Sequence, residues 1–319
     1  MQFFKTMFGL AVMIGGAAIG QPHQSHEENM SSELSPLTEQ ANKRQDQIAQ
    51  DHWPQIVVTN PPLHSLVWSI MGQNATPVLL FGSQTSHHHT ALKPSQLRQM
   101  AQADLLVWSG VQIESPISVV LQKQIIAVDH WSSQLCQGQR ALPMGSDQAG
   151  TDPHGWLDID NAVCYVNELV DKLMTIDPGR RLRYRSNATE LITQLKQLDN
   201  QLAQGFEMVD GEYMAYHNSF RYLLSRYGLT AKAELNLFNE QPPGLRRLLK
   251  FRQQLKSSAV GCLIADSSAS RHQLEQWQSG SSARLLMLDP MGRDIEPGPA
   301  LYFQLLTGLS EQMMSCIGG

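Results

Sequence analysis

The strongest constraint on the fold is an alternation of short apolar runs with amphipathic stretches along this 319-residue chain. The stretches between the runs have helical spacing, and the first one starts after Asn60 and ends at Gly72. Nearly continuous apolar strands that alternate with helices are typical of a parallel sheet covered on both faces. In the first half of the chain we expect four such strands, at Gln55–Thr59, Pro77–Phe81, Leu105–Trp108 and Gln124–Val128.

The second half of the chain repeats this alternation after a long polar stretch. Within that stretch leucines recur at spacings of four, three and four residues, at Leu191, Leu195, Leu198 and Leu202. This spacing predicts one long amphipathic helix. Four more strands are expected, at Tyr213–Tyr216, Ala231–Phe238, Val260–Ala265 and Leu285–Leu288. The sequence therefore predicts an α/β protein with two lobes, each a mostly parallel sheet flanked by helices, joined by one long spine helix.

The N-terminal segment has the features of a secretory signal peptide. Lys5 precedes an apolar run from Met7 to Ile19, and small residues before Gln21 indicate cleavage after Gly20. The polar segment that follows has few of the large apolar residues that a packed core needs. We assign residues 1–20 to the signal peptide, 21–50 to a flexible leader, 51–178 and 208–319 to the two lobes, and 179–207 to the linking helix.

Composition and motifs exclude some classes of function. The formal net charge is −5 and the chain has no contiguous basic run, so we do not expect nucleic acid as a partner. The sequence lacks G-x-x-x-x-G-K-[ST], so it does not hydrolyse ATP by that route. After the signal peptide, no apolar run reaches the roughly 20 residues that a membrane span needs. An exported protein is expected.

Several polar residues stand where predicted strands or loops end, and four of them form a candidate metal site: His88, His154, His217 and Asp289. Carboxyl ends of strands in open α/β sheets face the binding crevice, so these side chains, two from each lobe, are expected to converge there. Three imidazoles and one oxygen are a suitable tetrahedral set for zinc. Each residue also has a simpler explanation, because loop histidines are often surface residues and Asp before Pro often forms a turn.

Four segments also carry a resemblance to a known family: SHHHTALKPSQLRQMAQADLLVWSG, DPHGWL, YHNSFRYLLSRYGL and LLMLDPMG. In this order and spacing they resemble the periplasmic zinc-binding proteins of bacterial high-affinity zinc ABC importers. The resemblance extends from about Gln55 to the C-terminus. It implies a metal site in the cleft between the lobes, Zn²⁺ as the transported ligand and a membrane permease as partner. We accordingly expect a periplasmic protein, and a monomer.

The resemblance assigns the metal ligands position by position. The first histidine of the family lies six residues before the Pro of a Lys-Pro-Ser segment, and counting back from Pro94 selects His88. The histidine of Asp-Pro-His corresponds to His154, and the one after the second-lobe strand corresponds to His217. Manganese members usually have Glu at this third position, so His217 favours zinc. The fourth position corresponds to Asp289, or water takes that place.

The chain also departs from the family pattern. It lacks the long His-, Asp- and Glu-rich loop that zinc members often have before the second ligand. The segment ADSSAS stands where the family often has Glu-Pro-Gln-Phe. His87 and His89 flank His88 and compete for its role. Together with the leader histidines His23 and His26, they either help to collect metal or are solvated side chains.

The four cysteines of the chain indicate disulfides, because the count is even and the protein is expected to be exported. A bond between Cys316 and Cys262 would attach the last helix to a strand, and this pair resembles the disulfide of Gram-negative zinc members. Cys136 and Cys164 either form a second disulfide or remain buried free thiols.

These features predict a carrier that captures zinc and delivers it to a permease, and not an enzyme. A manganese or iron carrier of the same family is the alternative. A zinc hydrolase is a rival from another class, because three histidines and a water also form a catalytic zinc geometry. The chain lacks H-E-x-x-H, and its conceivable general bases, Glu212 and Asp266, are interpreted as solvated surface carboxylates.

Overall fold

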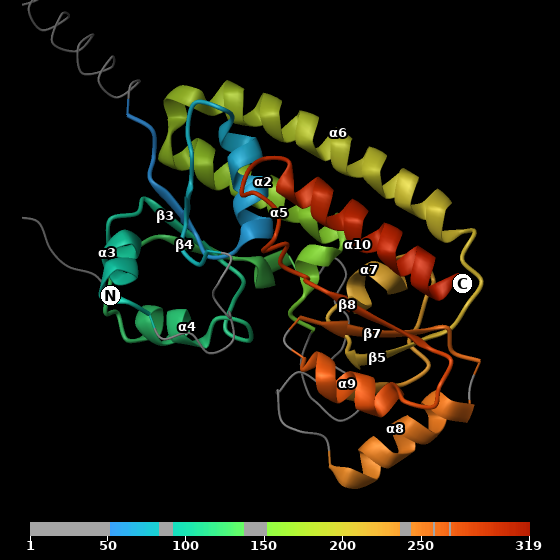
Figure 1. Cartoon of the computed structure of the whole chain (residues 1–319). Coiled ribbons are helices and arrows are strands. Elements are labelled where there is room, and N and C mark those ends of the chain that lie inside the picture. The colour runs from blue at the N-terminus through green and yellow to red at the C-terminus, as the bar shows by residue number, and fades with distance from the viewer. Residues whose placement is uncertain (1–51, 83–91, 137–151, 237–243, 258, 268) are drawn as a thin grey trace, which may run out of the picture. The chain divides into compact units, whose positions relative to one another are not determined.

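The structure is a computed structural model, and it describes residues 52–82, 92–136, 152–236, 244–257, 259–267 and 269–319. The chain from Trp53 to Gly319 forms one compact unit (Figure 1). It contains two four-stranded sheets, and every strand pair in both sheets is parallel. The α/β class with two parallel sheets is thus confirmed.

The first sheet has the strand order β2-β1-β3-β4. Its strands are β1 (Ile56–Val58), β2 (Val78–Leu79), β3 (Leu105–Trp108) and β4 (His130–Ser132). Successive residues of β1 and β3 point to opposite faces, and each face packs on a different apolar cluster. Helices α3 (Pro94–Ala101) and α4 (Ser115–Gln122) contribute to one of these clusters.

The prediction of a strand at Gln124–Val128 is wrong. The chain leaves α4 through Gln124, which has a positive φ of 51°, and Ile125 is 57% exposed. The fourth strand lies later, at His130–Ser132, where Trp131 is buried and pairs with Val107. Apolar composition selected the wrong segment because several residues of the true strand are polar and only Trp131 is directed into the core.

The second sheet has the order β6-β5-β7-β8, and its four strands confirm the repeated alternation. They are β5 (Tyr213–His217), β6 (Glu234–Asn236), β7 (Cys262–Asp266) and β8 (Arg284–Leu288). The register places Ala215 of β5 beside Ile264 of β7. The last residues of these two strands therefore lie at the same edge of the sheet. Helices α8 (Leu245–Ser257) and α9 (Arg271–Gln278) follow β6 and β7.

A long helix, α6 (Arg181–Phe206), links the two halves as predicted. Its buried stripe follows the leucine spacing and comprises Tyr184, Ala188, Leu191, Leu195, Leu198, Leu202 and Phe206. This face packs against α2 (Pro61–Met71), α5 (Ile159–Ile176) and α10 (Leu301–Ile317). Among the described residues, no helix combines the length and apolar character that crossing a membrane would require.

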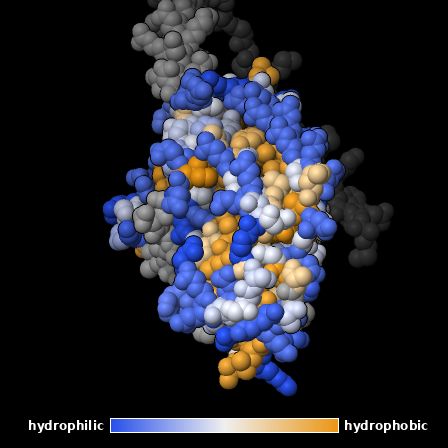
Figure 2. Space-filling model, turned by 45° about the vertical axis from the view of Figure 1, so that its right-hand side comes forward, coloured by the Kyte–Doolittle hydropathy of each residue, from blue (hydrophilic) through white to orange (hydrophobic). Residues whose placement is uncertain are grey.

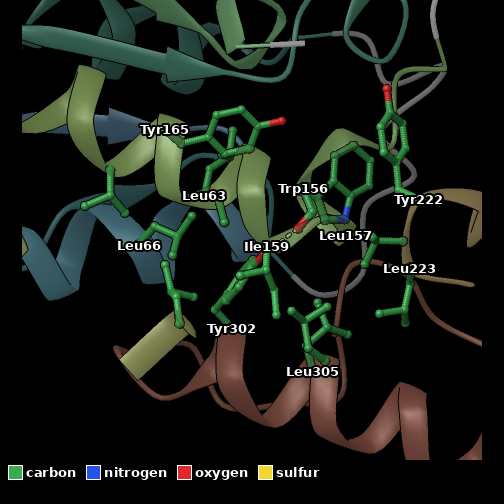
Figure 3. Packing of buried hydrophobic residues seen from close by; sticks show 14 of the residues in the cluster. Leu63, Leu66, Trp156, Leu157, Ile159, Tyr165, Tyr222, Leu223, Tyr302 and Leu305 are labelled. Atoms are coloured by element: carbon green, nitrogen blue, oxygen red, sulfur yellow. Dashed lines mark hydrogen bonds between the residues drawn. The ribbon is translucent and has the colours of Figure 1, made fainter. Parts of the chain in front are cut away.

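Side chains from distant parts of the sequence meet in the largest apolar cluster (Figure 3). The hydroxyl of Tyr302 donates to the carbonyl of Trp156 at 2.7 Å, and the indole N–H of Trp156 donates to the carbonyl of Pro290 at 2.9 Å. The hydroxyl of Tyr222, in α7 (Arg221–Arg226), donates to the carbonyl of Asp152 at 3.2 Å. These bonds hold the short 3₁₀ turn Gly155–Leu157 between the first and second halves of the chain.

The structure contains both candidate disulfides. Cys262 of β7 is bonded to Cys316 of α10, which ties the C-terminal helix to the second sheet. Cys136 is bonded to Cys164 of α5, so the alternative of two buried free thiols is excluded.

Candidate metal site

His154 lies in the turn that precedes Gly155–Leu157 and is 2% exposed. Its Nδ1 is 2.8 Å from Oδ1 of Asp152, a fully buried carboxylate. The same oxygen accepts the backbone N–H of His154 at 2.9 Å. The imidazole also packs edge-on against Trp156, with the ring centroids 5.3 Å apart. Asp152 therefore fixes both the backbone and the ring orientation of this histidine.

His217 is the last residue of β5 and is 7% exposed. Its Nδ1 is 2.7 Å from Oδ2 of Asp266, the last residue of the adjacent strand β7. The hydroxyl of Ser219 donates to the same carboxylate oxygen at 3.1 Å. Parallel pairing of β5 and β7 brings His217 and Asp266 together, because both strands end at the same edge of the sheet.

The two imidazoles lie next to each other, with ring centroids 5.3 Å apart and an interplanar angle of 68°. In both rings Nδ1 contacts a carboxylate, so Nε2 is the nitrogen that would coordinate a metal. A carboxylate on the second nitrogen fixes the tautomer and makes the ring a better metal ligand. This is the arrangement expected of two histidines in one metal site.

The charges around His217 change its affinity for protons. Burial alone lowers the pKa of His217, but the hydrogen bond and charge of Asp266 outweigh burial, with help from the charges of Asp152 and Glu234. The net pKa lies above its ordinary value. A metal must displace a proton from this ring when the ring is charged, so proton competition begins at a higher pH than for a solvated histidine.

Asp289 directly follows β8, and its carboxylate is engaged within a turn. Oδ1 accepts the backbone N–H of Met291 at 3.1 Å, and Oδ2 accepts the backbone N–H and Nε of Arg293 at 2.6 and 3.1 Å. The hydroxyl of Ser267 donates to Oδ1 at 3.5 Å. Since Ser267 is next to Asp266, this bond connects Asp289 to the carboxylate that holds His217. In the structure Asp289 therefore acts as a turn former, the simpler explanation for an Asp that precedes Pro.

The remaining predicted ligand, His88, lies outside the described residues, as do His87, His89, His23 and His26. The segment that carries the three consecutive histidines falls between β2 and α3. Within the described part of the chain, no group of three or more His, Cys, Asp or Glu is arranged to hold a metal ion. The structure thus brings together two of the four predicted ligands.

Sequence reasoning missed the two carboxylates that hold the histidines. The interpretation of Asp266 as a solvated surface carboxylate is wrong, because its side chain is buried against His217. Glu212, by contrast, is exposed and pairs with Lys232. A signal for Asp266 was present, since it ends an apolar strand at the same edge as His217. Asp152 stands two residues before His154, a spacing that allows contact with both the ring and the backbone.

Comparisons with known proteins agree with this fold. Solved metal-binding proteins with the same architecture include a zinc-bound deletion mutant of ZnuA, with a TM-score of 0.74, 20% identity, and coverage of 84% of this chain and 99% of that chain. FpvC of Pseudomonas aeruginosa in complex with Ni²⁺ has a TM-score of 0.71, 19% identity, and coverage of 83% and 97%. These similarities show that the chain shares the two-lobed fold of these proteins.

The family is defined by sequence. The model of the family described as zinc-uptake complex component A, periplasmic, matches residues 56–316. The chain therefore belongs to this ZnuA family. It is similar to the high-affinity zinc uptake system protein ZnuA of Paracoccus denitrificans, with 24% identity over 300 residues that cover 83% of this chain and 92% of the relative.

Proposed function

We propose that this chain is the solute-binding component of a zinc ABC importer, which captures Zn²⁺ in the periplasm and delivers it to the membrane permease. The observation that carries the proposal is the His154–His217 pair. The two rings come from different halves of the chain, lie 5.3 Å apart, and each has Nδ1 on a buried carboxylate. Membership of the ZnuA family supports the same function.

In this proposal zinc is the cargo, and its ligands are Nε2 of His154 and His217, together with His88 and Asp289. Asp289 would exchange a hydrogen bond from Arg293 for the metal, or water would take the fourth place. Three neutral imidazoles and one oxygen suit zinc. Asp266, one of the two conceivable bases of a zinc hydrolase, contacts His217 and Ser219. In this proposal it orients the His217 ligand.

Capture requires that the imidazoles lose their protons, so affinity for zinc should fall as the pH falls. The raised pKa of His217 moves the start of this fall to a higher pH than an ordinary histidine would give. Helix α6 packs along much of its length against α2, α5 and α10, which restricts bending between the halves. Metal binding should therefore be followed by a small local closure, and the loaded monomer would then dock on a permease driven by a separate ATPase.

The test is metal content and competitive titration of residues 21–319 after removal of metal with a chelator, with zinc and manganese offered together. We expect one tightly held zinc per chain, and its loss or strong weakening in His154→Ala and His217→Ala. His130→Ala is the matched control because His130 is exposed. Preference for manganese, or full zinc affinity in both ligand variants, would contradict the proposal.

A further inference from the structure

Helix α8 presents an outer face of unusual composition. Its thirteen residues, LRRLLKFRQQLKS, include five cations and no carboxylate, whereas the whole chain has a formal net charge of −5. The sequence alone does not show a contiguous basic run. The helix places three of these cations, Arg246, Lys250 and Lys256, on its exposed side, because positions three and four residues apart share a face.

The inner side of α8 is already used by the fold. Phe251 and Leu255 are buried in the apolar cluster on one face of the second sheet, and Leu248 packs against that cluster. The opposite side is exposed along the length of the helix and comprises Leu245, Arg246, Leu249, Lys250, Gln253 and Lys256. We call these six residues the α8 outer face. The helix is thus anchored in the domain with this face toward solvent.

The α8 outer face combines cations with exposed leucines. Leu245 is 71% exposed and Leu249 is 54% exposed, and they stand one turn apart beside Arg246 and Lys250. Figure 1 draws α8 at the lower end of the molecule. At the same level, Figure 2 shows hydrophobic atoms next to strongly hydrophilic ones. Exposed apolar side chains set among cations are the pattern of helices that lie on membrane surfaces.

Glu234, a carboxylate that lies beside α8, is paired with residues outside this helix. Glu234 of β6 borders the same depression as Arg246 and Lys250, but its carboxylate accepts from Arg221 and Asn218, each at 2.6 Å. Arg221 thus already balances the charge of Glu234. A shallow hollow runs along the helix and is bordered by Leu249, Gln253 and Lys256, among others. The face is therefore accessible to a partner with a broad, flat surface.

We propose that the α8 outer face is a docking surface for an anionic phospholipid membrane. Its cations would lie among the lipid headgroups, and Leu245 and Leu249 would enter the boundary with the acyl chains. Because the chain as a whole is acidic, an anionic membrane attracts it in an orientation that presents a cationic face such as this one. Each cation near such a surface contributes about fivefold to partitioning. The surface would hold the carrier at the membrane in which a permease resides.

The test is sedimentation of residues 21–319 with vesicles, in chelator so that zinc plays no part. Phosphatidylglycerol–phosphatidylcholine vesicles are compared with pure phosphatidylcholine vesicles, at low and high salt. We expect binding to the anionic vesicles only, and loss of that binding at high salt. The triple variant Arg246→Glu/Lys250→Glu/Lys256→Glu should bind at least about a hundredfold more weakly, from three lost cations.

The long helix α6 offers matched controls. Arg181→Glu/Arg185→Glu/Lys196→Glu makes the same change of net charge at three exposed positions. Leu182→Ser removes a leucine that is 81% exposed, for comparison with Leu245→Ser/Leu249→Ser. Circular dichroism reports folding of every variant. The α6 variants should retain most of the vesicle binding, and the α8 leucine variant should lose part of it.

Three outcomes would overturn the proposal. The first is no binding of the wild-type chain to anionic vesicles. The second is equal loss in the α6 and α8 charge variants, which would show an effect of net charge alone. The third is an α8 charge variant that still binds vesicles but no longer binds a detergent-solubilised permease. That result would assign the face to a protein partner. Since zinc is absent, failure of the zinc proposal would leave this test unaffected.

Discussion

At the scale of single residues, the site depends on two carboxylates that contact the histidines. Asp152 and Asp266 are buried, and each is bonded to Nδ1 of one imidazole. Leaving a carboxylate buried in this way is costly unless it is paired. The two pairs therefore fix the direction of both Nε2 atoms before any metal arrives.

Replacement of Asp266 by Asn should separate this orienting role from a structural one. Asn has nearly the same size, but it holds the His217 ring less firmly and makes it less basic. We expect Asp266→Asn to lower zinc affinity about 10- to 100-fold while the thermal unfolding midpoint changes little. Competitive chelator titration measures the affinity. Asp160→Asn, at an exposed carboxylate, is the control, and equal affinities in both variants would contradict this role for Asp266.

A second buried carboxyl group, Glu114, links stability to pH. Burial raises the pKa of Glu114 to about 7, despite hydrogen bonds from Thr59, Ser109 and Asn60. The folded state therefore binds a proton that the unfolded chain releases near pH 4.5, and stability falls as the pH rises from about 4.5 to about 7. The stability lost over this range is on the order of 3 kcal/mol.

Glu114→Gln should remove this dependence because glutamine does not titrate. The free energy of unfolding of the variant minus that of the wild-type protein should be larger at pH 8 than at pH 5. Urea unfolding of both proteins at both pH values measures this difference. An identical difference in free energy of unfolding at the two pH values would show that Glu114 does not titrate in this range.

At the scale of elements, the spine helix α6 is held by its buried stripe. Leu195 is fully buried near the middle of the helix, whereas Leu182 at its start is 81% exposed. We expect Leu195→Ala to lower the free energy of unfolding by about 2–5 kcal/mol. Leu182→Ala should change it by less than about 0.5 kcal/mol. Urea denaturation compares the two, and similar losses would mean that the stripe does not carry the packing.

At the scale of the whole molecule, two disulfides connect segments that are distant in sequence. The bond Cys262–Cys316 closes a loop of 54 residues and Cys136–Cys164 one of 28. In the chain-entropy model the two disulfides contribute about 4 and about 3.5 kcal/mol, respectively, to the free energy of unfolding. Each Cys→Ser pair should lower the free energy of unfolding by these amounts, measured by urea unfolding. A larger effect at Cys136–Cys164 would show that entropy of the unfolded chain is not the main term.

The sequence by itself determined the α/β class and the spine helix, and it predicted His154 and His217, which the structure places side by side. The class and the helix follow from periodicity, which is a property of neighbouring residues. The spine helix, for example, needs only that its leucines recur at a spacing that puts them on one face.

Only the tertiary structure decided which carboxylate holds which histidine, where the fourth strand lies, and that Cys136 bonds Cys164. The pairing of His217 with Asp266 depends on the register of two strands separated by helices and loops, and the sequence of neither strand specifies its partner. The cations of α8 became a surface only when Phe251 and Leu255 were buried on the other side. Such features arise because side chains far apart in the chain are brought into contact by packing, which local patterns do not encode.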